Sequence, residues 1–73
     1  SRCSIVTHVS SGSAAEKAGL RKWDIITHLD GKDWARTDAV REAVRSKRDG
    51  ETLAVRVIRE GKPVELTVTP DRN

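Results

Sequence analysis

The sequence contains one cysteine and two histidines, Cys3, His8 and His28, whose side chains could ligate a metal ion such as zinc. Each histidine alternates with apolar residues along an extended stretch, so the two could face each other across a sheet. Zinc sites usually show close ligand spacings such as HExxH or CxxC, and the sequence contains neither. We therefore expect no metal and no cofactor, and two histidines that face solvent or a sheet edge.

A second candidate for chemistry is the serine-rich segment around Gly12, which contains Ser10, Ser11 and Ser13. It lacks the GxSxG pattern of a nucleophile elbow. Gly12 and Gly19 also do not form a phosphate-binding loop. Since Ser13 has a sufficient role as a helix cap, we expect no catalytic residue in this chain.

Basic residues gather in one part of the chain, namely Arg36, Arg41, Arg45, Lys47 and Arg48. A nucleic-acid interface combines such a cluster with stacking aromatics, and neither Trp23 nor Trp34 is interleaved with it. A solvated helix face is the simpler interpretation. A basic module that contacts nucleic acid or an anionic membrane surface remains the alternative, and steeply salt-dependent binding would identify it.

Length and composition limit the chain to one small domain. It has 73 residues, a formal net charge of +3 and one cysteine, which excludes an internal disulfide. Charges of both signs alternate along it. No apolar run approaches the roughly 20 residues that span a bilayer.

The elements that must position any site begin with a short helix after Ser13. The Ser13 hydroxyl can accept from a free backbone N–H, and Glu16 can reach back to the Ser13 amide in a capping box. Gly19 is suited to end this helix in the left-handed conformation. A helix this short is not stable alone, so it must pack on something larger.

Alternating apolar residues predict strands at 5–9, 24–29, 53–57 and 64–68, and a brief one at 32–34. Asp30-Gly31 and Glu60-Gly61-Lys62 are turn sequences. A longer helix is expected from Thr37 to about Lys47, with Val40 and Val44 in the core. The pattern indicates an α+β, mainly β fold of about five strands with one short and one longer helix. Trp34 is expected to cover one end of the core, and Trp23 to be partly exposed.

With these elements in place, the chain resembles a PDZ domain of the bacterial type from Ile5 to about Pro70. The resemblance is carried by Val9, the segment 13–20 (SAAEKAGL), Asp24 with Ile26, Asp30-Gly31, the amphipathic helix and the segment 59–62 (REGK). The tail, residues 57–70, is most similar to the PDZ domains of site-2 metalloproteases, followed by those of HtrA-type serine proteases. The whole chain, 1–73, is interpreted as one such domain in a partly open small barrel.

The resemblance implies a non-catalytic module that binds extended or C-terminal peptide segments by strand addition and positions substrate for an envelope protease. Its partners would be substrate peptides and the rest of the parent protease, with a membrane nearby and no nucleic acid. The predicted peptide-binding residues lie on one strand edge and on the long helix: Ile5, Val6, Thr7, His8, Val9, Ala39, Ala43 and Ser46.

Two departures from the family pattern stand out. Trp23 occupies a position where the family has glycine, so the local turn is expected to form differently. Only four residues precede Ile5, so the family's carboxylate-binding loop and its strand are expected to be lacking or truncated, with that strand following Asn73 in the permuted topology.

Overall fold

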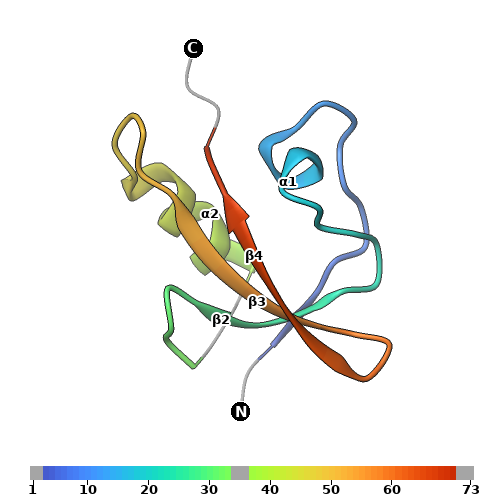
Figure 1. Ribbon diagram of the computed structural model, residues 1–73. Coiled ribbons are helices and arrows are strands. Elements are labelled where there is room, and N and C mark those ends of the chain that lie inside the picture. The colour runs from blue at the N-terminus through green and yellow to red at the C-terminus, as the bar shows by residue number, and fades with distance from the viewer. Residues whose placement is uncertain (1–2, 34–36, 71–73) are drawn as a thin grey trace.

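The computed structural model describes residues 3–33 and 37–70, without side chains for 37–39. One antiparallel sheet carries two helices. In Figure 1, α2 lies to the left of the long β3–β4 hairpin and α1 to its right, and residues of both helices pack against the same core. The elements are β1 (Ser4–Ile5), α1 (Ala14–Lys17), β2 (Ile25–Leu29), α2 (Thr37–Ser46), β3 (Leu53–Arg59) and β4 (Lys62–Val68). The predicted mainly β fold is confirmed, with four strands in the described part of the chain instead of about five.

The inner face of the sheet carries the hydrophobic core. Alternate residues of β3 are almost fully buried, with Leu53 and Val57 at 0% exposure and Val55 at 2%. The remaining buried apolar residues are Val6, Ile26, Leu29 and Val68. The period-two pattern of the sequence therefore identified this face correctly.

The β3–β4 hairpin closes through a two-residue turn. Glu60 and Gly61 both have positive φ, at 52° and 78°, and Arg59 pairs with Lys62. Two successive residues of this kind match the right-handed twist of the flanking strands. Asp30 and Gly31, at 51° and 80°, make a second such turn, after which only Lys32 bridges back to Leu29. Of the predicted strand at 32–34, the described residues 32 and 33 form only one bridge, and Trp34 lies outside the described residues.

The short helix α1 has the predicted caps with one difference. Ser13 Oγ accepts from the Glu16 N–H at 3.2 Å, and Gly19 adopts φ 94° after the helix. Glu16, however, accepts from the Gly12 N–H at 2.8 Å and not from Ser13. The Ser13 N–H donates instead to the Ser10 carbonyl, so the loop before the helix has already satisfied it.

The first strand is shorter than predicted, because regular pairing with β2 covers only Ser4 and Ile5. Val6 still donates to the Asp24 carbonyl, and the Trp23 N–H donates to the Val6 carbonyl at 2.6 Å. Trp23 has φ 77°, which turns the backbone out of the ladder. The expectation that this turn forms differently without glycine is therefore wrong: tryptophan occupies the left-handed conformation itself.

Two carboxylates connect the elements. Asp24, 1% exposed, receives both Nε and Nη2 of Arg59, and Arg59 also donates to the Gly19 carbonyl. Asp30 accepts from the Ala54 N–H at 2.9 Å and from Lys47 Nζ at 2.7 Å. The hydrogen bond from Arg59 lowers the pKa of Asp24, and the one from Lys47 lowers the pKa of Asp30. These contacts fix the start and the end of β2.

Candidate functional site

A groove of about 530 Å³ lies between the first extended segment and helix α2. It is lined by Ser4, Ile5, Val6, Thr7, His8, Leu20, Ile26, Val40, Arg41, Val44 and Arg45. One wall is backbone of an edge strand, since β1 is the terminal strand of the sheet. The other wall is a helix, so the groove combines the two elements that a strand-addition site requires.

The chemistry of the groove is apolar with a basic rim. Val6 and Ile26 are buried at its floor, and Val40 and Val44 are half-buried on the helix side. Arg41 is exposed on the helix wall. Such a surface can take the apolar side chains of an extended peptide, while the cation favours an acidic group nearby.

The strand half of the predicted site lies together in this groove, as Ile5, Val6, Thr7 and His8 all line it. Val9 does not line it, because its half-buried side chain packs against the core. The structure thus assembles four of the five strand residues into one wall.

The helix half of the predicted site is not brought into this groove. Ala43 and Ser46 line a separate depression of about 340 Å³, beside Leu29 and Leu53. The side chain of Ala39 lies outside the described residues. Val40, Arg41, Val44 and Arg45 face the groove instead, since residues three and four apart share a helix face. Val40 and Val44 were assigned to the core alone, yet they border core and groove together.

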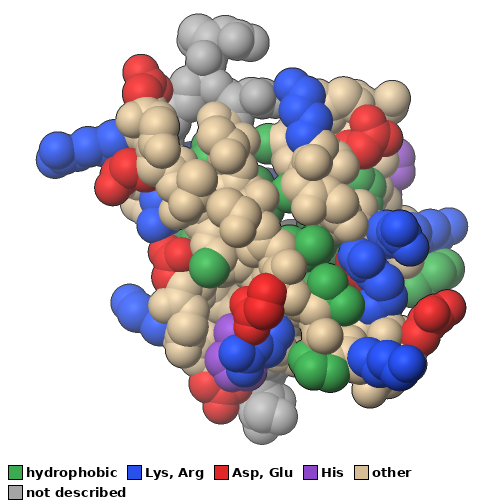
Figure 2. All heavy atoms as spheres, in the orientation of Figure 1, with side chains coloured by type: hydrophobic (Ala, Val, Ile, Leu, Met, Phe, Trp, Pro, Cys, Tyr) green, Lys and Arg blue, Asp and Glu red, His purple; other side chains and the backbone are tan. Residues whose placement is uncertain are grey.

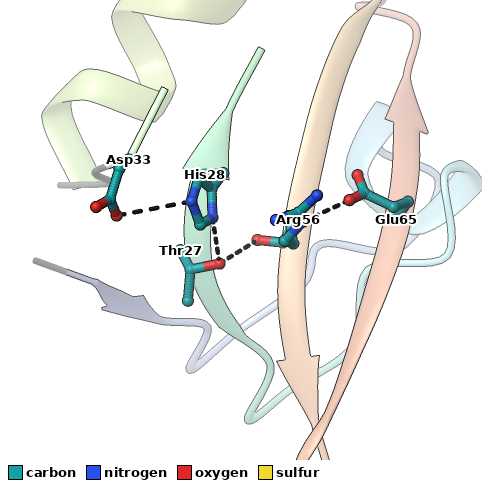
Figure 3. Close-up of polar contacts among 5 residues, drawn as sticks. All are labelled: Thr27, His28, Asp33, Arg56 and Glu65. Carbon is teal, nitrogen blue, oxygen red and sulfur yellow. Dashed lines mark hydrogen bonds and ion pairs between the residues drawn. The ribbon is translucent and has the colours of Figure 1, made fainter. Parts of the chain in front are cut away.

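A polar cluster occupies the opposite, outer face of the sheet (Figure 3). His28 Nδ1 lies 2.9 Å from Thr27 Oγ1, and His28 Nε2 lies 3.7 Å from Asp33. The Thr27 hydroxyl donates to the Arg56 carbonyl, and Arg56 pairs with Glu65 across β3 and β4. Thr27, His28 and Asp33 place a hydroxyl, an imidazole and a carboxylate in a row, as in a catalytic triad. The Thr27 hydroxyl proton, however, is donated to a backbone carbonyl and not to His28, and the cluster is open to solvent.

The two histidines do not meet, contrary to one sequence interpretation. His8 lines the groove, whereas His28 belongs to the outer cluster with Asp33. Among residues 3–33 and 37–70 no three potential ligands from Cys, His, Asp and Glu gather as a metal would require. In the same part of the chain, no helix is long and apolar enough to cross a membrane.

Comparison with known proteins agrees with this geometry. The sequence model of the PDZ domain matches residues 2–69. The chain is 42% identical over 65 residues to a "Probable periplasmic serine endoprotease DegP-like" of Chlamydia trachomatis. The aligned region covers 89% of the chain and 13% of that protein. The chain is also 41% identical over 68 residues to a "Putative zinc metalloprotease" of Rhizobium meliloti. This aligned region covers 93% of the chain and 18% of that protein.

Among solved structures, an HtrA-type protease, AlgW, determined with a decapeptide matches with a TM-score of 0.79. The identity is 26%, and the match covers 94% of this chain and 21% of the other. The chain belongs to the PDZ domain family, and its relatives include both HtrA-type and zinc proteases. Within such proteases the PDZ domain is a non-catalytic module. The chain spans less than a fifth of the length of these curated relatives.

Proposed function

We propose that this domain binds an extended or C-terminal segment of a protein substrate in the groove between the 4–8 segment and α2. It would thereby position that substrate for a protease domain of the same longer protein in the cell envelope. One observation carries the proposal: a terminal strand and a helix border an apolar groove large enough for peptide side chains. Two relatives support it: one is named as a probable periplasmic protease, and the other is an HtrA-type protease whose structure was determined with a decapeptide.

Strand addition supplies the binding mechanism. The outward backbone groups of the edge segment can pair with a peptide, which gives affinity that does not depend on sequence. Side chains at alternate peptide positions would then enter between Val40 and Val44 on the helix and the buried Val6 and Ile26 at the floor of the groove. Selectivity for apolar side chains follows from that lining.

The test is a two-dimensional amide NMR titration of this chain with short apolar peptides that end in a free carboxylate. We expect shifts concentrated at residues 4–8 and at 40, 41, 44 and 45. A peptide of identical sequence with N-methylated alternate amides is the matched control, because it keeps the side chains but loses backbone donors. Equal binding of the two peptides, or shifts elsewhere, would contradict strand addition.

Salt separates this proposal from the basic-module alternative. Binding through apolar contacts and backbone hydrogen bonds should change little between low and moderate salt. Polyanion binding through the α2 cations should fall steeply, because it depends on counterion release. Ala43→Gln, in the separate depression, should leave peptide affinity unchanged.

A further inference from the structure

An apolar row crosses the whole sheet on the face opposite the core. Ile5 is the partner of Ile25, Ile25 of Ile58, and Ile58 of Pro63, so one residue from each strand lies side by side. Alternation along β3 places Ile58 on the face of Ala54 and Arg56, while Val55 and Val57 face the core.

These four residues lie outside the hydrophobic core. Ile5 is 57% exposed, Pro63 is exposed, and Ile25 and Ile58 are half-buried. None belongs to the core cluster or to the partly buried residues packed against it. The face of a sheet that is open to solvent normally presents polar residues, so an apolar row across four strands indicates a contact surface.

Trp23 precedes Ile25 by two residues and adds an aromatic side chain to this end of the sheet. Its ring is exposed, at 65%, although its backbone is held at φ 77°. A bulky residue in the left-handed region is strained by about 1–2 kcal/mol, and glycine would avoid that strain. Strained residues that persist cluster at functional sites, and the small buried fraction of the Trp23 ring offsets little of the strain here.

The same end of the molecule is rich in exposed cations. Arg21, Lys22 and Lys62 are exposed, and Lys22 Nζ lies 4.9 Å from the centre of the Trp23 ring. Asp24 is neutralised by Arg59, which leaves Glu60 as the exposed acid beside them. Figure 2 shows hydrophobic side chains among Lys and Arg at its lower right, where Figure 1 places the segment before β2 and the β3–β4 turn.

We propose that the Ile5–Ile25–Ile58–Pro63 row of the outer face, together with Trp23 and the cations at the adjoining end of the molecule, docks on an anionic lipid membrane surface. Tryptophan favours the headgroup level of a bilayer because its ring is apolar and its N–H is polar. Lysine and arginine near the surface are attracted to anionic lipids. The apolar row, bordered by cations, matches that layered environment in both polarity and charge.

The proposal is independent of the peptide groove in its charge and aromatic components. Arg21, Lys22, Trp23 and Lys62 do not line the groove. Peptide binding and membrane binding should therefore be separable by mutation, and a failure of one leaves the other testable.

The experiment measures vesicle binding of this chain by Trp fluorescence and by co-sedimentation. Vesicles of equal parts phosphatidylcholine and phosphatidylglycerol are compared with pure phosphatidylcholine, in a Trp34→Phe background so that Trp23 alone reports. We expect a blue shift, quenching by brominated lipid and at least about tenfold weaker binding without the anionic lipid.

Two variants test the surface itself. Trp23→Gly removes the indole at a position where the backbone favours glycine, so lost binding cannot be attributed to misfolding. The double variant Lys22→Gln with Lys62→Gln should weaken binding about tenfold or more. Arg41→Gln with Arg48→Gln removes the same charge from the α2 region and should change binding far less.

Binding that depends on Arg41 and Arg48 instead would overturn the proposal in favour of the basic helix. Absence of binding to anionic vesicles at low salt would also overturn it. Self-association of the chain that is lost in Trp23→Gly, without vesicle binding, would assign the face to a second copy.

Discussion

The two faces of the sheet differ in what their apolar residues do. On the inner face, Leu53, Val55 and Val57 are at most 2% exposed and form the core. On the outer face, Ile25 and Ile58 are half-buried and Ile5 is 57% exposed, although they are as apolar. Apolar character alone therefore does not identify core residues in a small domain, because the helices pack against the inner face of the sheet and leave the outer face uncovered.

Truncation of one residue on each face tests whether the two faces differ in their contribution to stability. Leu53→Ala should destabilise the domain by about 3 kcal/mol, because it leaves a cavity at a fully buried site. Ile58→Ala should cost about 1 kcal/mol, since the side chain is already partly hydrated. Urea unfolding followed by circular dichroism measures both. Equal losses would mean that the outer row is packed in solution.

A domain of this size has a margin of only about 3–5 kcal/mol, so Leu53→Ala is expected to retain only about 0–2 kcal/mol and to be partly unfolded at room temperature. Leu53→Val, a smaller truncation at the same site, keeps the comparison measurable. Its loss should still exceed that of Ile58→Val.

The inner face also contains the buried carboxylate of Asp24, and acid should weaken the domain through this group. Arg59 holds the pKa of Asp24 below its ordinary value, so the pair contributes stability above about pH 4. That contribution is lost as the pH falls through the lowered pKa, since the unfolded state then binds more protons. Asp24→Asn should lower the free energy of unfolding by about 2 kcal/mol at neutral pH, because the Arg59 guanidinium loses the carboxylate that neutralises it.

The measurement is the urea midpoint of both proteins at neutral pH and at pH values below 4. The midpoint of Asp24→Asn should fall less with acid than that of the unmodified chain. Asp30→Asn should show a reduced acid dependence as well, because Lys47 lowers the pKa of Asp30 in the same window. A variant with the full acid dependence of the unmodified chain would show that Asp24 is not responsible.

The smallest expected effect concerns the strained tryptophan of the outer end. Trp23→Gly and Trp23→Ala remove the same indole, but alanine keeps the left-handed strain at φ 77°. The glycine variant should therefore be about 1 kcal/mol more stable than the alanine variant, which is roughly 4–8 °C in Tm. Thermal unfolding followed by circular dichroism measures the gap. If alanine equals glycine, the strain at this position is absent.

Sequence by itself determined most of the local structure. The Ser13 cap, the Asp30-Gly31 turn and the β3–β4 hairpin follow from short-range backbone preferences, and the structure confirms them. The resemblance to PDZ domains was also readable from short segments, and the family comparison confirms it. These features depend on neighbours within a few residues, which the sequence displays directly.

The site depended more on tertiary structure. Ala43 and Ser46 were chosen as small residues on the helix, but the rotation of α2 about its axis directs Val40 and Val44 to the groove. That rotation is decided by packing on the sheet and not by the helix pattern, because both faces contain small or apolar residues. Trp23 shows the same limit, since a residue that disfavours positive φ was expected to change the turn.

The apolar row on the outer face was invisible to the sequence for a related reason. Ile5, Ile25, Ile58 and Pro63 are far apart in the chain and become neighbours through the strand register. Register is set by long-range pairing and by which face finds a partner. Local energetics thus determined the elements of this domain, and tertiary packing alone decided which of their faces stay open.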